Sequence, residues 1–149
     1  MLVAIQPLTQ GQVPLPYTKK ELQTIEEHIP KESLVKFGIP EAPAHVQDIL
    51  SALPTASFVH LACHGVQDAT NPLDSMLLLE GQLKVSQLMK LDMRKASLVF
   101  LSACQTAMVD DTLPDEPIHL AATLLFAGFR GAVATMWYVA IVRSVTLVS

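Results

Sequence analysis

The 149-residue sequence has few charged residues, few aromatic residues and only two cysteines, and these scarcities exclude several classes of protein. Charged residues make up 16% of the chain and hydrophobic residues 50%, which excludes a disordered polar segment and favours a globular protein. The formal net charge of −4 gives no electrostatic reason to expect a nucleic acid partner. We therefore expect a single domain over residues 1–149, with a substantial hydrophobic core.

Targeting signals and long apolar segments are also lacking. The N-terminus has no basic leader followed by a long apolar region, so we expect no signal peptide. The apolar run at residues 132–142 is far shorter than the ~20 residues that a membrane-spanning helix needs. These absences predict a cytoplasmic protein without a membrane partner, in which Cys63 and Cys104 are free thiols.

What the chain does contain is an alternation of apolar strands with segments of helical periodicity. Helices are predicted at residues 18–29, 44–53, 85–91 and 117–127. Strands are predicted at residues 1–6, 33–37, 57–63, 75–79, 97–104 and 131–137. In the first helix, Thr18 is expected to cap the N-terminus, with Glu21 three residues later as in a capping box. The alternation predicts an α/β fold, with a mostly parallel central sheet and helices on both faces.

Two of the predicted strands end on a reactive side chain. The segment Phe58–Gly65 (FVHLACHG) leads to His64, and the segment Leu98–Thr106 (LVFLSACQT) leads to Cys104. Ligands bind at the carboxyl ends of the strands in an open parallel sheet, so both side chains are expected at one edge. A thiol beside an imidazole is the arrangement of a cysteine nucleophile with its general base.

Each of these residues also has a simpler interpretation. A single cysteine in an apolar strand is usually a small core residue, and a single histidine at a strand end usually makes an ordinary hydrogen bond. Gly65 adds to the catalytic interpretation, because the glycine leaves a backbone N–H unobstructed and suited to an oxyanion. The occurrence of both strand endings in one chain favours catalysis by His64 and Cys104.

Other chemistries are disfavoured by spacing. On a strand, His60 and His64 lie about 13 Å apart and Cys63 points to the opposite face, so the three cannot share a metal ion. Ser102 lacks the G-x-S-x-G elbow that serine hydrolases use. No glycine-rich phosphate-binding fingerprint follows a strand. We therefore expect no metal and no cofactor.

Two features near the same edge are candidate substrate contacts. Asp110 and Asp111 lie in an acidic loop after Cys104, which either selects a basic group on a substrate or is a solvated loop before the next helix. Trp137 ends the last predicted strand, where it either packs in the core or forms a wall of a substrate cleft.

Together these segments resemble a CHAT domain, a branch of the caspase, metacaspase and separase group of cysteine peptidases. The similarity is carried by the segments S-F-V-H-L-A-C-H-G (57–65), N-P-L-D-S (71–75), L-V-F-L-S-A-C-Q-T (98–106) and H-L-A-A-T-L-L-F-A-G-F-R-G-A-V-A-T-M-W (119–137). The resemblance implies a caspase-like three-layer sandwich and a dyad with His64 as base and Cys104 as nucleophile. It also implies oxyanion donors from the backbone N–H groups of Gly65 and Cys104, and a thioester acyl-enzyme.

The resemblance further implies a protein or peptide substrate and, in a longer parent protein, TPR-type helical repeats as partners. Ser102 stands where metacaspases carry an aspartate that favours basic P1 residues, so Ser102 is expected in the substrate site without that preference. Members of the family usually continue beyond Trp137 with further helices and strands, so we expect an incomplete domain. The alternative hypothesis is a non-catalytic interaction or regulatory module that keeps the fold.

Overall fold

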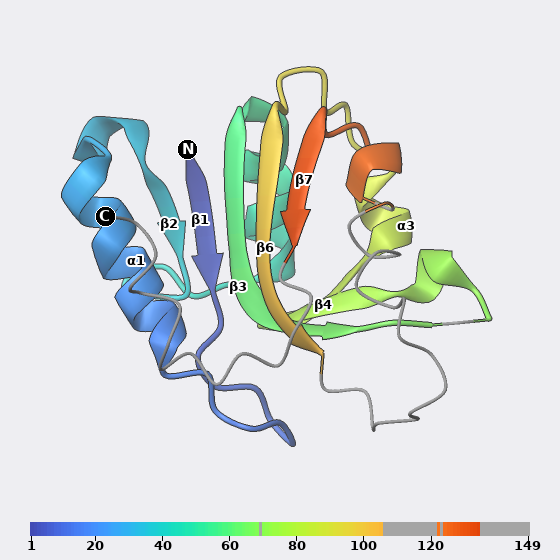
Figure 1. Ribbon diagram of the computed structural model, residues 1–149, viewed down its shortest axis with the longest axis horizontal. Coiled ribbons are helices and arrows are strands. Elements are labelled where there is room, and N and C mark those ends of the chain that lie inside the picture. Colours follow the sequence, from blue (N-terminus) through green and yellow to red (C-terminus); the bar gives the residue numbers. More distant parts are fainter. Residues whose placement is uncertain (69, 106–121, 123, 135–149) are drawn as a thin grey trace.

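The computed structural model describes residues 1–68, 70–105, 122 and 124–134, apart from the side chains of residues 103–105 (Figure 1). The strands are β1 (Leu2–Ile5), β2 (Val35–Phe37), β3 (Phe58–Val66), β4 (Met76–Leu79), β5 (Gly81–Lys84), β6 (Leu98–Gln105) and β7 (Gly131–Ala134). The helices are α1 (Tyr17–His28), α2 (Val46–Ala52) and α3 (Val85–Leu88), with 3-10 turns at Lys31–Ser33, Leu53–Thr55 and Pro72–Asp74. In this described part of the chain, no helix has both the length and the apolar character needed to cross a membrane.

Strand β3 organises the sheet because it pairs with three other strands. It runs parallel to β1 on one edge and parallel to β6 along its other edge. The outer strands β2 and β7 are parallel to β1 and β6 respectively. Where β1 has ended, β4 pairs antiparallel with residues 64–66 of β3, and β5 pairs antiparallel with β4. The sheet is therefore mixed, with an antiparallel hairpin attached to a set of parallel strands.

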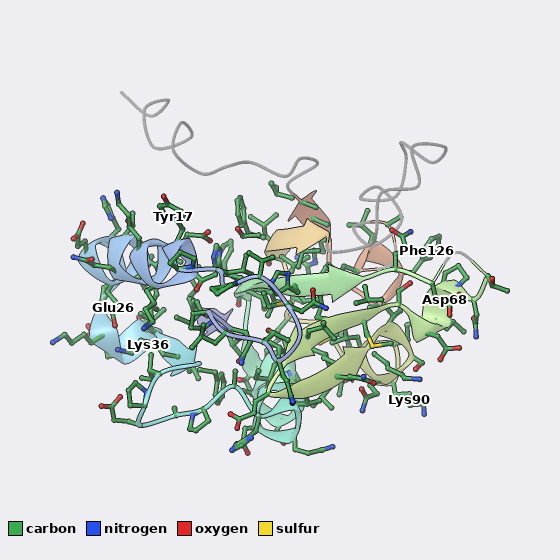
Figure 2. All side chains as sticks on the ribbon, turned by 90° about the horizontal axis from the view of Figure 1, so that it is seen from below. Tyr17, Glu26, Lys36, Asp68, Lys90 and Phe126 are labelled. Atoms are coloured by element: carbon green, nitrogen blue, oxygen red, sulfur yellow. The ribbon has the colours of Figure 1, made fainter. Side chains whose placement is uncertain are left out.

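The two faces of β3 pack against different helices, because successive side chains of a strand point to opposite sides. Leu61 and Cys63 belong to the larger hydrophobic cluster, which includes Ile49 of α2. Ala62 belongs to a smaller cluster with Leu22 of α1. Figure 2 shows α1 and α2 on opposite sides of the sheet. The predicted α/β class is confirmed.

Most predicted elements are present, with shifted ends. β3 continues to Val66, so His64 and Gly65 lie within a strand and not in the turn expected after residue 63. Strand β5 was not predicted, because Gly81, whose φ is 116°, indicated only a turn. Of the helix predicted at 117–127, residues 122 and 124–126 are helical, and residues 117–121 and 123 lie outside the described part. The last strand is described up to Ala134.

Candidate active site

The register of the sheet places His64 and Cys104 beside each other on neighbouring parallel strands. Their Cα atoms are partners in the β3–β6 pairing, two and one residues before these strands end at Val66 and Gln105 respectively. Both residues therefore lie toward the carboxyl ends of their strands, where the sequence predicted them. The side chain of Cys104 lies outside the described part of the structure.

The imidazole of His64 is buried and held by a backbone carbonyl. Its Nε2 atom lies 2.8 Å from the carbonyl oxygen of Val13. A carbonyl oxygen only accepts hydrogen bonds, so Nε2 is the donor and, in the neutral ring, Nδ1 carries the lone pair. Nδ1 is buried and has no hydrogen-bond partner among the described side chains and backbone groups. The fold therefore presents His64 with one nitrogen fixed as a donor and the other available as a base.

Val13 belongs to the loop that connects β1 to α1. The N–H of Leu15 donates to the carbonyl of Pro7 at 2.8 Å, which closes the loop on itself. Pro14 restricts the backbone of Val13 to extended conformations. Sequence reasoning did not identify Val13, because a carbonyl oxygen is common to every residue type. The only signal was the density of prolines in a short connector.

A second polar network joins α1 to the two central strands. Glu21 accepts a hydrogen bond from Nε2 of His60 at 2.8 Å through Oε2, and one from Oγ of Ser102 at 3.0 Å through Oε1. The His60 ring also stacks on Phe100, with centroids 5.1 Å apart and planes inclined by 11°. Helix α1 is thus attached to β3 and β6 by a carboxylate, on the face that carries His64.

The predicted capping box of α1 is wrong. The N-cap position is Pro16, which makes no side-chain capping bond, and the Thr18 hydroxyl instead donates to the carbonyl of Leu15 at 2.8 Å. The helix begins at Tyr17, one residue earlier than the prediction, so Thr18 lies inside it. Glu21 consequently points to the sheet and not back to the helix N-terminus.

The second thiol, Cys63, lies in an apolar environment that makes it unreactive. It is fully buried in the larger hydrophobic cluster, and this burial raises the pKa of Cys63 to about 12. A thiol with so high a pKa stays protonated near neutral pH and is a poor nucleophile. Cys63 also lies on the face opposite His60, as the strand argument against a shared metal ion predicted.

The other residues predicted for the site do not all lie on the face of the sheet that carries His60 and His64. Ser102 is half-buried and its hydroxyl is engaged by Glu21. Gly65 lies inside β3, as the register partner of Leu77 on β4 and of Gln105 on β6. Asp110, Asp111 and Trp137 lie outside the described residues. Across the described ranges, no group of three or more His, Cys, Asp or Glu side chains is arranged to hold a metal ion.

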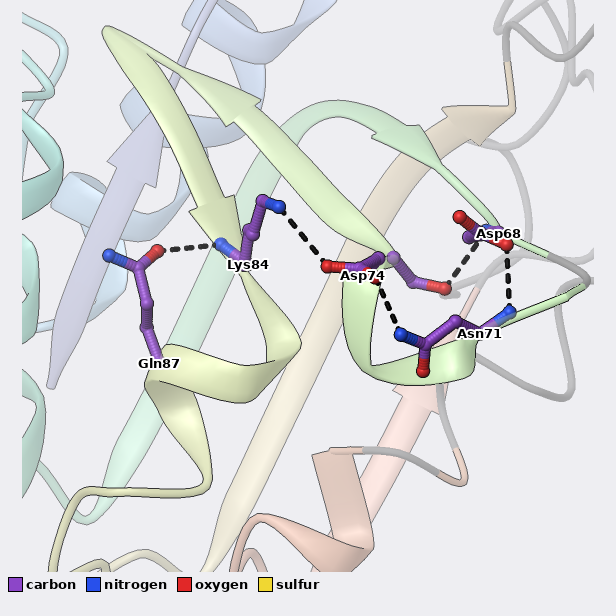
Figure 3. Close-up of polar contacts among 6 residues, drawn as sticks. Asp68, Asn71, Asp74, Lys84 and Gln87 are labelled. Carbon is purple, nitrogen blue, oxygen red and sulfur yellow. Dashed lines mark hydrogen bonds and ion pairs between the residues drawn. The ribbon is translucent and has the colours of Figure 1, made fainter.

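The segment that follows Gly65 is held in place by polar contacts (Figure 3). Asp68 accepts from the N–H of Asn71, and the backbone N–H of Asp68 donates to the buried hydroxyl of Ser75. Asp74 accepts from the side chain of Asn71 and forms an ion pair with Lys84 at 3.1 Å. These contacts turn the chain from β3 into β4. The N-P-L-D-S segment therefore shapes the carboxyl end of the strand that carries His64.

The sequence matches a known protein family. A family model of the CHAT domain matches residues 2–149, which is nearly the whole chain and includes both His64 and Cys104. No curated protein matches the sequence.

Proposed function

Since the chain belongs to the CHAT domain family, a caspase-like peptidase family, we propose that it is a cysteine endopeptidase that uses Cys104 and His64. The register pairing of these two residues on parallel strands carries the proposal. It is supported by the state of the imidazole, whose Nε2 is occupied by Val13 while Nδ1 is left as an acceptor. A caspase-like three-layer sandwich, with α1 on one face and α2 on the other, is part of the same proposal.

In this mechanism, His64 acts as a general base through Nδ1. It takes the proton of the Cys104 thiol, and the thiolate attacks the carbonyl carbon of the scissile peptide bond. The carbonyl of Val13 accepts a hydrogen bond from Nε2 and stabilises the imidazolium that forms. The imidazolium then returns its proton to the leaving amine, which leaves a thioester on Cys104. Water hydrolyses the thioester, again with His64 as base.

The negative oxygen of the tetrahedral intermediate needs hydrogen-bond donors. We assign this role to the backbone N–H groups of Gly65 and Cys104, which are in adjacent strands at the same edge of the sheet. Asp110, Asp111 and Trp137 remain candidates for contacts with the substrate.

The experiment is a cleavage assay on a library of fluorogenic peptides in which every residue type occurs at P1. Cleavage by the wild-type chain is expected to fall by at least about 10³-fold in Cys104→Ala and in His64→Ala, because either change removes the nucleophile or its base. Cys63→Ala is the matched control and is expected to keep its cleavage. If the folded wild-type chain cleaves no peptide, the proposal fails and the non-catalytic interaction module takes its place.

A further inference from the structure

One charged group beside the proposed dyad has no part in the mechanism described above. The carboxylate of Glu21 lies against Ser102, with 3.0 Å between Oε1 and the hydroxyl oxygen. Ser102 is two residues before Cys104 on β6, and residues two apart on a strand share a face, with a spacing of about 7 Å. A negative charge is therefore fixed about two strand positions from the nucleophilic residue.

The Glu21 carboxylate retains capacity for a further partner. Each of its oxygens accepts one hydrogen bond from the described residues, from Ser102 and His60 respectively, whereas a carboxylate has about four acceptor positions. Its side chain is 24% exposed, so it is reached by solvent, while the His60 side chain beside it is 8% exposed. Glu21 is thus oriented by hydrogen bonds from His60 and Ser102, and its side chain is still partly exposed.

The location suits the side chain of the residue whose carbonyl is attacked. When Sγ of Cys104 bonds to that carbonyl carbon, the P1 Cα is one bond away, and its side chain starts within reach of the neighbouring sheet surface. Ser102 and the partly exposed Phe100 form that surface along β6. Only a long P1 side chain reaches from Cys104 across about two strand positions to Glu21. A cation at the end of that side chain would form an ion pair with the Glu21 carboxylate. Lysine and arginine have both properties, and arginine also offers two parallel N–H donors to a carboxylate.

We infer that Glu21 determines the P1 specificity of this domain and selects substrates with arginine or lysine at P1. The inference rests on the proposed peptidase function. In this arrangement Ser102 acts indirectly, since its hydroxyl holds a carboxylate that comes from α1. A serine at this position is thereby compatible with a preference for basic residues.

The test compares matched peptides that differ only at P1, with arginine, lysine, norleucine or aspartate in that position. For the wild-type chain, kcat/KM is expected to be at least about tenfold higher for arginine and lysine than for norleucine, as for a hydrogen-bonded charge pair. Glu21→Gln keeps the shape of the side chain and is expected to remove most of this preference, with a larger loss of kcat/KM for arginine and lysine than for norleucine. Glu27→Gln, which removes one exposed carboxylate from the same helix, is the matched control and keeps the preference.

A charge reversal makes the test independent of small effects on folding. Glu21→Lys is expected to favour aspartate over arginine at P1, a gain that damage to the fold cannot produce. Equal losses for all four peptides in Glu21→Gln, or a wild-type preference for norleucine or aspartate, would overturn the role of Glu21 and leave the peptidase function standing. Absence of cleavage of all four peptides and of the full P1 library would overturn both.

Discussion

The Nε2 atom of His64 lies 2.8 Å from the carbonyl oxygen of Val13, a residue 51 positions earlier in the chain. The contact joins the loop after β1 to the end of β3, two segments that the parallel β1–β3 pairing brings to one edge of the sheet. Because its acceptor is a backbone atom, the contact fixes the tautomer of His64 whatever side chain occupies position 13. Catalysis by His64 should then depend on the conformation of the loop and not on the valine side chain.

This dependence can be measured with two neighbouring substitutions. Pro14→Gly frees the backbone of Val13 and is expected to lower kcat/KM for peptide cleavage about fivefold, which corresponds to an ordering cost of about 1 kcal/mol. Val13→Ala keeps the carbonyl and removes part of an exposed side chain, so it is expected to leave kcat/KM within about twofold of the wild type. The opposite ranking of the two variants would show that the carbonyl does not orient the base.

The proposed dyad should also be visible in the chemistry of its thiol. A free cysteine has a pKa of about 8.5, and a cysteine paired with an imidazolium has a pKa well below that. The rate of iodoacetamide labelling at Cys104, located by peptide mapping, is therefore expected to be high at pH ~6. His64→Ala should move the midpoint of labelling to about pH 8.5. An alkaline midpoint in the wild-type chain would mean that the thiolate is not stabilised there.

Cys63 should instead affect stability at alkaline pH. Burial raises its pKa from 9.0 to about 12, so above pH 9 the unfolded chain loses this proton while the folded chain keeps it. The free energy of unfolding is expected to fall between pH 9 and pH 12 by up to ~1.4 kcal/mol per pH unit through this group. Urea unfolding of the wild type and Cys63→Ala across this range measures the difference in slope. Parallel curves for the two proteins would contradict the raised pKa.

Gly38, directly after β2, lies so close to the backbone of Ile5 that a substitution there is expected to lower the stability of the domain strongly. Gly38 has a φ of 87°, and a Cβ atom there would lie 1.8 Å from the carbonyl oxygen of Ile5. Gly38→Ala is expected to destabilise the domain by more than about 2 kcal/mol, because the left-handed conformation alone costs an alanine roughly 1–2 kcal/mol and the clash adds to it. Urea unfolding midpoints with their m-values measure this.

Gly11→Ala provides the matched control for Gly38→Ala. Gly11 has a similar φ of 76°, and no atom lies within 4 Å of an added Cβ. Its substitution should cost only the conformational penalty of about 1–2 kcal/mol. If the two variants lose the same stability, the contact between Gly38 and Ile5 relaxes at no cost.

The order of elements could be predicted from the sequence because it depends on local patterns. The apolar runs of β3 and β6 and the helical periodicity of α1 and α2 are properties of short windows, and each corresponds to an element of the structure. The position of His64 and Cys104 beside each other, near the carboxyl ends of their strands, could be predicted as well. Each residue lies near the end of an apolar run, and parallel pairing aligns such ends.

The tertiary structure alone decided what surrounds those two residues. The local sequence predicted that Glu21 belongs to a capping box. Because α1 packs against the sheet, Glu21 instead accepts hydrogen bonds from His60 and Ser102. The hydrogen-bond acceptor for His64 is a backbone carbonyl oxygen. Every residue has one, so the residue type at position 13 gave no indication of this contact. Apolar periodicity is encoded residue by residue, whereas the partners of a polar atom depend on which distant segments the packed sheet brings together.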